Sequence, residues 1–209
     1  MIEYWESKFK NEGLMWGFLP SDSAIRTSDM FKANKFKQIL IPGFGYGRNA
    51  KLFLENGFEV TGIEISESAI DLAKANGLNC LIHHGSVTSM PFDDKKYDGI
   101  FCYAVIHVLN KTERQNFLKS CFNQLKNNGL MVFVVASIRT GMYGTGKYLS
   151  KDRFEISKGL KVFFYDSESV SKEFSPYGII ECDDIEEPIK FMKDQDPVKM
   201  LFVICKKCQ

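Results

Sequence analysis

A turn that carries three glycines in five residues constrains this sequence more than any other feature. The turn, residues 42–47, lies between an apolar run typical of a buried strand, residues 36–41, and a segment with helical spacing of apolar side chains, residues 46–56. Glycine is required where the backbone bends sharply and a ligand approaches it closely. A second apolar run ends at Glu64, 21 residues after Gly43. A carboxylate at this point can accept hydrogen bonds from both hydroxyls of a ribose, so the order of elements predicts a ligand that contains a nucleoside.

Strands and helices alternate along most of the chain. Apolar runs rich in β-branched and aromatic residues predict strands, and amphipathic segments closed by glycine predict helices. We therefore predict strands at residues 36–41, 58–63, 79–82, 97–103 and 130–136, and helices at residues 46–56, 67–76 and 111–126. Strands with two apolar faces that alternate with helices indicate a doubly wound α/β fold, in which helices cover both faces of a parallel sheet.

The C-terminal part departs from this alternation. A predicted helix at residues 167–174 is followed by two predicted strands, at residues 178–187 and 198–205. We expect these two strands to pair as an antiparallel hairpin at the end of the sheet. The length suits one domain with a full core and is short for two, so residues 1–209 are expected to form a single domain.

The domain divides into four parts on this interpretation. Residues 1–35 are predicted to form one or two helices that act as an N-terminal helical cap, and residues 36–136 form the cofactor-binding core. Residues 137–165 are a long, irregular stretch with four glycines, which we interpret as a substrate-side insertion because long loops are usually functional or disordered. Residues 166–209 supply the C-terminal helix and strands.

The composition argues against several other classes of protein. The 27 basic and 26 acidic residues give a formal net charge of +1, so no excess of positive charge favours nucleic acid. The apolar run at residues 130–136 is far shorter than the ~18 to 20 residues that cross a membrane, and the N-terminal segment lacks the apolar core of a signal peptide. Three of the six cysteines lie in strand-like apolar runs, which is typical of free thiols in a reducing cytosol. We therefore expect a cytoplasmic protein that binds neither nucleic acid nor membranes.

The spacing of the glycines indicates which nucleoside is bound. The dinucleotide fingerprint is G-x-G-x-x-G, whereas here the third glycine, Gly47, comes one residue earlier and Arg48 takes the next position. An arginine fits poorly where a helix must pack beneath a pyrophosphate. A G-x-G-x-G turn suits a ligand without phosphates whose amino-acid end lies over the glycines, and S-adenosylmethionine is such a ligand.

Several segments resemble the motifs of the class I S-adenosylmethionine-dependent methyltransferases. They are residues 39–50, 62–66, 90–107 and 125–132. Residues 4–5 and 16–20 also resemble the small-molecule branch that includes thiopurine and tellurite-resistance methyltransferases. With the seven strands predicted above, the resemblance implies a Rossmann-like, mostly parallel seven-stranded sheet with an antiparallel C-terminal strand. It also implies S-adenosylmethionine as cofactor and methyl transfer to a small-molecule acceptor.

The resemblance further implies which residues hold the cofactor, with Glu64 on the ribose. The family often carries Gly-Asp after the third strand, with the acid on the adenine amino group, whereas this chain has Gly85-Ser86. Ser86 can still make one hydrogen bond, and the backbone N–H of Val87 can meet a ring nitrogen. The expected cofactor-binding residues are Gly43, Phe44, Gly45, Gly47, Arg48, Asn49, Glu64, Ile65, Ser86, Val87, Tyr103 and Ala104.

Candidates for the acceptor side follow the fourth strand, because open α/β sheets bind ligands at the carboxyl ends of their strands. His107 and Tyr103 are the candidate catalytic residues, and His107 is either a general base or a packed histidine. Methyl transfer mainly requires alignment of the acceptor, so a base is useful only when the acceptor is protonated at neutral pH. Trp5, Trp16 and Tyr143 are the candidate substrate residues, because aromatic side chains cover apolar or planar molecules.

No metal site is expected from the sequence. Cys205 and Cys208 have C-x-x-C spacing, but no second pair of ligands accompanies them. The motifs of enzymes that methylate nucleic-acid bases are missing, which leaves a small molecule as the expected acceptor. Two alternatives stay open: a nicotinamide-dependent oxidoreductase on the same fold, and a non-catalytic cofactor-binding protein, which Ser86 favours. The oligomeric state also stays open.

Overall fold

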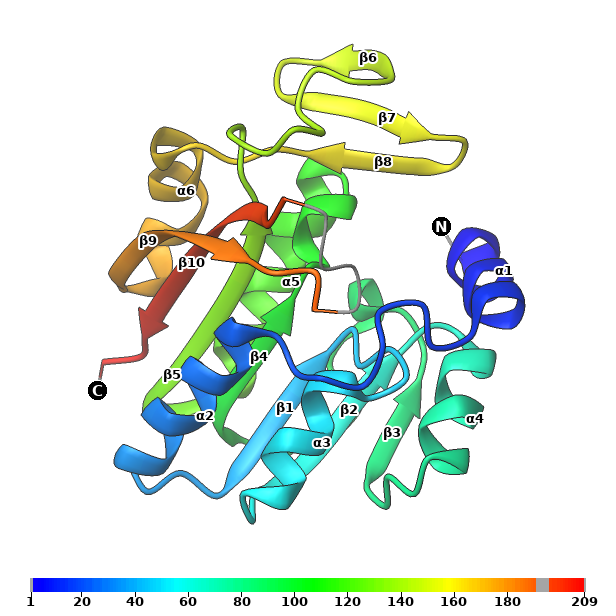
Figure 1. Ribbon diagram of the computed structural model, residues 1–209. Helices are drawn as coiled ribbons and strands as arrows, with labels where there is room; N and C mark the ends of the chain where they lie inside the picture. The colour runs from blue at the N-terminus through cyan, green and yellow to red at the C-terminus, as the bar shows by residue number, and fades with distance from the viewer. Residues whose placement is uncertain (1, 191–195, 209) are drawn as a thin grey trace.

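The computed structural model describes residues 2–190 and 196–208, and its main element is a seven-stranded sheet (Figure 1). The strand order is β3-β2-β1-β4-β5-β10-β9, and β10 runs antiparallel to both of its neighbours while the other pairs are parallel. The strands are β1 (Gln38–Pro42), β2 (Glu59–Glu64), β3 (Leu81–His84), β4 (Tyr97–Tyr103), β5 (Leu125–Ala136), β9 (Ile179–Glu187) and β10 (Val198–Lys206). The expected mostly parallel sheet with an antiparallel C-terminal strand is confirmed.

Helices cover both faces of this sheet, and each face has its own hydrophobic layer. The α-helices are α1 (Ile2–Glu12), α2 (Asp22–Ala33), α3 (Arg48–Glu55), α4 (Glu67–Ala75), α5 (Lys111–Gln124) and α6 (Ser167–Phe174). One layer contains Phe31 of α2 and Phe53 of α3, and the other contains Phe117 of α5 and Phe174 of α6. From Leu130 to Val135, consecutive residues of β5 alternate between the two layers, which is why this part of the strand is apolar throughout.

Local sequence signals set the ends of these helices. The side chain of Ser66 caps α4, and Asn110 and Glu113 form a reciprocal capping box at the start of α5. Gly57 and Gly77 follow α3 and α4 with φ values of +80° and +78°, the left-handed conformation that commonly ends a helix. The predicted helix starts at residues 67 and 111 and the glycine stops at residues 57 and 77 are therefore confirmed, whereas α3 begins at Arg48, two residues after its predicted start.

The largest boundary error lies between α5 and β5. The sequence predicts a helix to residue 126 and a strand from residue 130, whereas the helix ends at Gln124 and the strand begins at Leu125. Leu125 already has an extended conformation, with φ −80° and ψ 136°. β5 is paired with β4 and β10, so tertiary pairing prevails over local helix preference at this point.

The insertion contains a small sheet, whereas the sequence predicts an irregular stretch, so that prediction is wrong. Residues 147–163 form a three-stranded antiparallel sheet of β6 (Lys147–Ser150), β7 (Arg153–Ser157) and β8 (Leu160–Phe163) above the main sheet (Figure 1). Its strands have only four or five residues, so their sequences are too short to show the alternation of apolar and polar residues that predicts a strand. The turns between them place Asp152 and Gly159 at φ +58° and +86°. Val162 packs against Val108 and Ala136, at the carboxyl ends of the central strands.

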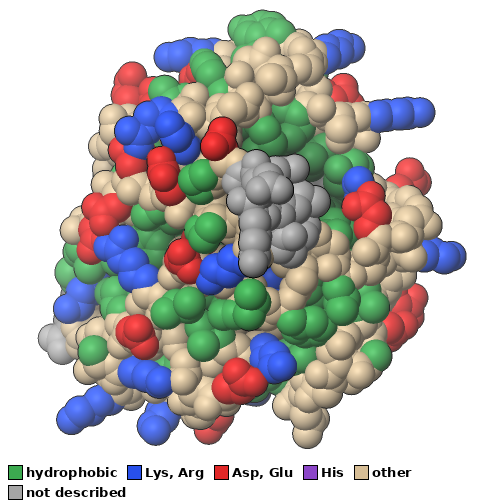
Figure 2. Space-filling view, in the orientation of Figure 1, with side chains coloured by type: hydrophobic (Ala, Val, Ile, Leu, Met, Phe, Trp, Pro, Cys, Tyr) green, Lys and Arg blue, Asp and Glu red, His purple; other side chains and the backbone are tan. Residues whose placement is uncertain are grey.

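The surface carries both signs of charge. On the face seen in Figure 2, Lys and Arg side chains are interspersed with Asp and Glu. Within residues 2–190 and 196–208, no helix is both long enough and apolar enough to cross a membrane.

Candidate active site

The glycine turn follows β1 and leads directly into α3. Gly43, Gly45 and Gly47 have φ values of +71°, +57° and +81°, a region that other residues rarely adopt. A β-carbon at Gly43 would lie 2.0 Å from Cγ2 of Val105, in the loop after β4. The turn therefore needs glycine both for its backbone conformation and for the close approach of this loop.

Glu64, the predicted ribose ligand, ends β2 with only 5% of its surface exposed. Its Oε1 accepts hydrogen bonds from the N–H groups of Ile65 and Ser66 (2.8 and 2.9 Å), and its Oε2 accepts one from the N–H of Gly45 (2.6 Å). Burial raises the pKa of this carboxyl, and the three N–H groups oppose that shift because they favour the charged form. A carboxylate oxygen accepts about two hydrogen bonds, so Oε2 retains room for one more. Glu64 ties the glycine turn to the end of β2.

The loop after β3 holds the residues expected near adenine. Ser86 caps the short helix η1 (Val87–Ser89): its Oγ accepts a hydrogen bond from the N–H of Thr88 (3.2 Å) and lies 2.7 Å from Thr88 Oγ1. A hydrogen bond from Ser86 to a ligand would therefore compete with Thr88. Val87 is buried and begins η1, where helix geometry leaves its N–H without an intrahelical acceptor.

The start of α3 forms a cationic corner beside the turn. α3 begins at Arg48, and its N-cap, Gly47, has no side chain to cap it. The guanidinium of Arg48 lies 5.5 Å from the ring centre of Tyr103, at the end of β4. Burial raises the pKa of Tyr103 to about 12, so its hydroxyl is protonated at neutral pH. Asn49 Oδ1 accepts the N–H of Ser21 (2.9 Å) and so joins α3 to the start of α2. The helix N-terminus adds partial positive charge to that of Arg48.

His107 lies in the short helix η2 (Ile106–Val108), just after β4, and is 8% exposed. Its Nδ1 accepts the backbone N–H of Ala136 (3.1 Å), which ties the end of β5 to this loop. The loop bends tightly before η2, where Ala104 has a φ of +59°. Burial lowers the pKa of His107 to about 4, so the ring is neutral at pH 7 and its proton is on Nε2. This geometry agrees with the packed-histidine interpretation, and a catalytic role for His107 stays a prediction.

α1 and the segment after it cover the glycine turn. Tyr46 is buried within the turn, and its hydroxyl accepts the N–H of Trp16 (3.0 Å) and donates to the carbonyl of Gly17 (2.8 Å). The Trp16 ring stacks on Tyr46 with centroids 6.2 Å apart, and Trp5 lies 6.2 Å from Trp16. The structure therefore brings Trp5 and Trp16 together beside the turn.

Glu6 fastens α1 to the start of α4. Its carboxylate accepts hydrogen bonds from the hydroxyls of Ser66 and Ser68 (2.7 and 2.5 Å) and from the N–H of Ser68 (3.2 Å). Glu6 and Tyr46 are not among the residues predicted from the sequence. Glu6 and Ser66 are 60 positions apart, so no local pattern connects them, although the pair of serines at a helix start signals a capped N-terminus.

Tyr143 lies in the insertion and is 38% exposed. Its hydroxyl donates to the carboxylate of Asp152 (2.8 Å), and its ring packs edge-on against Phe154 and Phe164. These contacts all lie within the insertion, so none of them joins Tyr143 to the two tryptophans.

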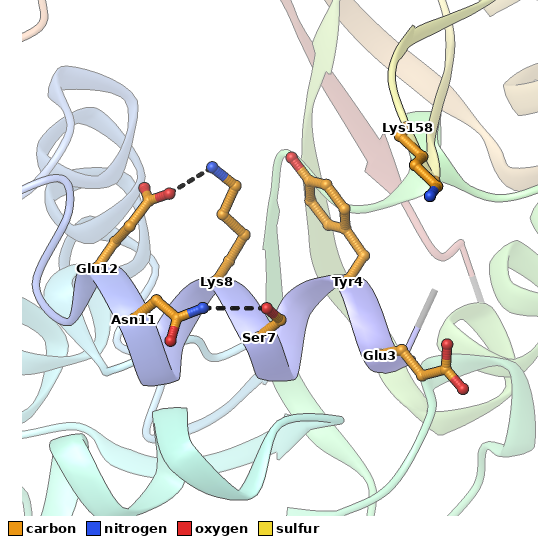
Figure 3. A pocket seen from close by; sticks show the side chains of 8 residues that line it. Glu3, Tyr4, Ser7, Lys8, Asn11, Glu12 and Lys158 are labelled. Carbon is orange, nitrogen blue, oxygen red and sulfur yellow. Dashed lines mark hydrogen bonds and ion pairs between the residues drawn. The ribbon is translucent and has the colours of Figure 1, made fainter.

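α1 meets the insertion at the turn between β7 and β8 (Figure 3). There the hydroxyl of Tyr4 accepts a hydrogen bond from Ser157 Oγ (3.4 Å), and a β-carbon at Gly159 would lie 3.6 Å from Cδ2 of the Tyr4 ring. A surface groove of about 420 Å³ lies beside this contact and is lined by Glu3, Tyr4, Ser7, Lys8, Asn11, Glu12, Lys158 and Gly159. α1 and the insertion therefore form a joined cover at the carboxyl ends of the strands.

The cysteines show no sign of metal ligation. Cys205 is buried in β10 and Cys208 is exposed beyond it, and both are free thiols. In the described part of the chain, no three His, Cys, Asp or Glu side chains lie close enough together to hold a metal ion.

Two curated relatives share part of this sequence. The chain is 32% identical over 132 residues to an uncharacterized protein of Rickettsia prowazekii. It is 29% identical over 143 residues to a Geobacillus protein provisionally named a methyltransferase. The matches cover 56% and 64% of this chain but only 24% and 56% of the relatives, so the chain spans about a quarter and about half of their lengths.

A family model and a solved structure agree on the core. Residues 40–133, which run from β1 into β5, match the family described as a methyltransferase domain. The fold is similar to that of the Burkholderia thailandensis 1,6-didemethyltoxoflavin-N1-methyltransferase, with a TM-score of 0.74 between the two structures. That enzyme was solved with 1,6-didemethyltoxoflavin and S-adenosylhomocysteine bound. The comparison covers 100% of this chain and 87% of that one, at 14% identity, which shows the shared fold alone. Residues 40–133 thus match the methyltransferase-domain family, and the chain shares the fold of the Burkholderia thailandensis methyltransferase.

Proposed function

We propose that this protein transfers a methyl group from S-adenosylmethionine to a small-molecule acceptor. The observation that carries the proposal is the glycine turn at the start of α3, which Glu64 holds through the N–H of Gly45. The same residues lie inside the segment that matches the methyltransferase family.

The donor groups around the turn fit this cofactor. Oε2 of Glu64 has room for one ribose hydroxyl, with Ile65 beside it, and the N–H of Val87 suits an adenine nitrogen. The cationic corner at Arg48 suits the carboxylate of the methionine end, with Tyr103 and the loop of Ala104 beside it. The remaining expected contacts come from Gly43, Phe44, Gly45, Gly47, Asn49 and Ser86.

When bound, the cofactor supplies a methyl group that its positive sulfur has already made electrophilic. The protein then has to hold the acceptor in line behind that methyl group and to exclude water. The cover formed by α1 and the insertion suits this task, with Trp5 and Trp16 above the turn. Tyr143 lies in the insertion, so it would contact the acceptor only from that part of the cover.

A small molecule is the acceptor that the comparisons favour. The Burkholderia thailandensis enzyme of the same fold holds 1,6-didemethyltoxoflavin, a small molecule. The relatives are longer than the part that this chain matches, so the acceptor is a proposal and not a property of the family. A reducing compartment such as the cytoplasm suits the six free cysteines.

The experiment that tests the proposal is calorimetric titration with S-adenosylmethionine, NADH and NADPH in parallel. We expect saturable binding of S-adenosylmethionine and no binding of either nicotinamide cofactor. Tight binding of NADH or NADPH alone would favour the oxidoreductase. Binding of S-adenosylmethionine without turnover on a panel of thiols, amines, phenols and carboxylates would favour the non-catalytic protein.

A further inference from the structure

Four side chains near the carboxyl ends of the strands could take a proton from a bound acceptor, and each of them is already engaged in the structure. In the described part of the chain, the carboxyl ends of β2, β4 and β9 carry Glu64, Tyr103 and Glu187, and His107 follows β4. An acceptor that has a proton on its attacking atom needs one such group as a general base.

Both carboxylates are held by backbone N–H groups. Glu187 is buried, and its two oxygens accept the N–H groups of Asp22 and Ser23 (3.0 and 2.9 Å) at the start of α2. Glu64 accepts three N–H groups and so holds the glycine turn. Protonation of either carboxylate would weaken these charge-assisted hydrogen bonds, so both act as anchors.

The two neutral candidates are engaged as well. Nδ1 of His107 is the acceptor for Ala136, and Nε2 carries a proton, so no lone pair of the ring is free. Tyr103 keeps its proton and lies under the guanidinium of Arg48. His84 ends β3, three strands from β4 in the sheet order, and its Nε2 lies 3.2 Å from the carbonyl of Ile65.

We infer that the acceptor attacks through an atom that already has an unshared electron pair and no proton to lose at neutral pH, as a thiolate does. This inference rests on the proposed methyl transfer. The acceptor's electron pair forms the new bond to the methyl carbon, and the pair of the broken carbon–sulfur bond returns to the cofactor sulfur. For a thiolate the products are two neutral thioether groups, so no proton has to be taken up by the protein.

The test compares acceptors that differ in their own pKa. Benzenethiol and phenylmethanethiol carry a phenyl group and attack through sulfur, but the first ionises at a lower pH. Initial rates with the wild-type protein and S-adenosylmethionine give kcat/KM from pH 5.5 to 9.5, with phenol as the matched oxygen acceptor. We expect kcat/KM to rise tenfold per pH unit up to each thiol's own pKa and then to level off, so that the two breaks fall at different pH values. Phenol, with a pKa of about 10 as in tyrosine, should show no plateau in this range.

Three results would overturn the inference. One is a break at the same pH for both thiols, because that pH would belong to a base of the protein. The second is a plateau for phenol near neutral pH. The third is the failure of both thiols as acceptors in a preparation that binds S-adenosylmethionine by calorimetry. Absence of that binding would instead contradict the proposed function itself, and the calorimetric arm distinguishes the two failures.

Discussion

At the scale of single residues, the carboxylate of Glu64 accepts three backbone N–H groups and so joins the glycine turn to the end of β2. The position of this acid after the second strand can be predicted from the sequence, because it depends only on the order of the elements. The hydrogen bond from Gly45 to Glu64 cannot be predicted from the sequence, because it forms when the ends of β1 and β2 meet in the sheet. The carboxylate therefore has a structural part beside the ligand part that the sequence predicts.

Replacing Glu64 tests both parts. Glu64→Ala removes the acceptor for a ribose hydroxyl, and a lost charge-assisted hydrogen bond of about 1.5–3 kcal/mol weakens S-adenosylmethionine binding by about 10- to 150-fold. Glu64→Gln keeps one oxygen for Ile65 and Ser66 but turns an N–H toward the N–H of Gly45. We expect Glu64→Gln to lose about 1–3 kcal/mol of unfolding free energy in denaturant titration. Wild-type cofactor affinity in Glu64→Ala would show that this acid is not the ribose ligand.

His107 makes stability depend on pH through its burial. The pKa is about 4 in the folded protein against 6.5 for an ordinary histidine, so the unfolded chain binds more protons between these values. The contribution of the neutral ring to the free energy of unfolding is fully present above pH 6.5 and is lost as the pH falls toward 4. The loss is at most roughly 3 kcal/mol. His107→Asn keeps an oxygen near the position of Nδ1 for the N–H of Ala136 but cannot titrate. Denaturant titrations at pH 7 and pH 4.5 should show a smaller loss of stability in His107→Asn than in the wild type. Equal losses would mean that His107 is not buried in its neutral form.

At the scale of elements, the core was predictable and the cover only in part. The strand from Tyr97 to Tyr103 and the helix from Ser167 to Phe174 have the predicted bounds, because local pattern and tertiary burial agree there. α1 was expected as a helix, but its docking on α4 depends on the side chain of Glu6, which no pattern marks. The insertion was expected to be irregular, because its strands are too short to show a period.

The docking of α1 can be tested at Glu6. Glu6→Ala removes the acceptor for the two serine hydroxyls at the start of α4, whereas Glu3→Ala changes an exposed glutamate of the same helix. We expect faster amide hydrogen exchange across α1 and a shift in tryptophan fluorescence in Glu6→Ala only, since Trp5 and Trp16 pack together at this cover. The KM for the acceptor should rise as well. If both variants behave alike, the carboxylate of Glu6 does not hold α1.

The role of the insertion can be tested by a substitution that leaves the glycine turn after β1 unchanged. A β-carbon at Gly146 would lie 2.2 Å from the carbonyl oxygen of Glu155 in β7, and φ there is +76°. Gly146→Ala should therefore distort the pairing of β6 and β7, at about 1–2 kcal/mol for the backbone conformation alone. Gly141→Ala, which has open space around its added carbon, is the matched control. We expect a raised acceptor KM in Gly146→Ala and an unchanged affinity for S-adenosylmethionine by calorimetry. If the affinity for S-adenosylmethionine fell as much as the acceptor KM rose, the insertion would contribute to cofactor binding and not to acceptor binding alone.

At the scale of the whole molecule, the proposed cofactor site lies where separate parts of the chain meet. The turn after β1, the end of β2 and the loop after β4 converge through Gly45, Glu64 and Val105. The fold was predictable because it follows from element order and two-sided burial, which are properties of the sequence. The joining of α1 to the insertion through Tyr4 and Ser157 was not, because it depends on how two peripheral parts meet in space.

Since these parts meet at one site, a ligand that binds only the folded chain should raise the melting temperature of the whole domain. At a concentration of 100 Kd the stabilisation is about 2.7 kcal/mol. For a chain of this length, that corresponds to a rise in Tm of roughly 5–11 °C. We expect this rise with S-adenosylmethionine or S-adenosylhomocysteine in a thermal melt, and no rise with NADPH at the same concentration. Glu64→Ala should lose most of the rise, because the ligand then binds more weakly at an unchanged concentration. A rise with NADPH and none with S-adenosylhomocysteine would contradict the cofactor assignment, and the Rossmann-like fold would then serve the alternative oxidoreductase chemistry.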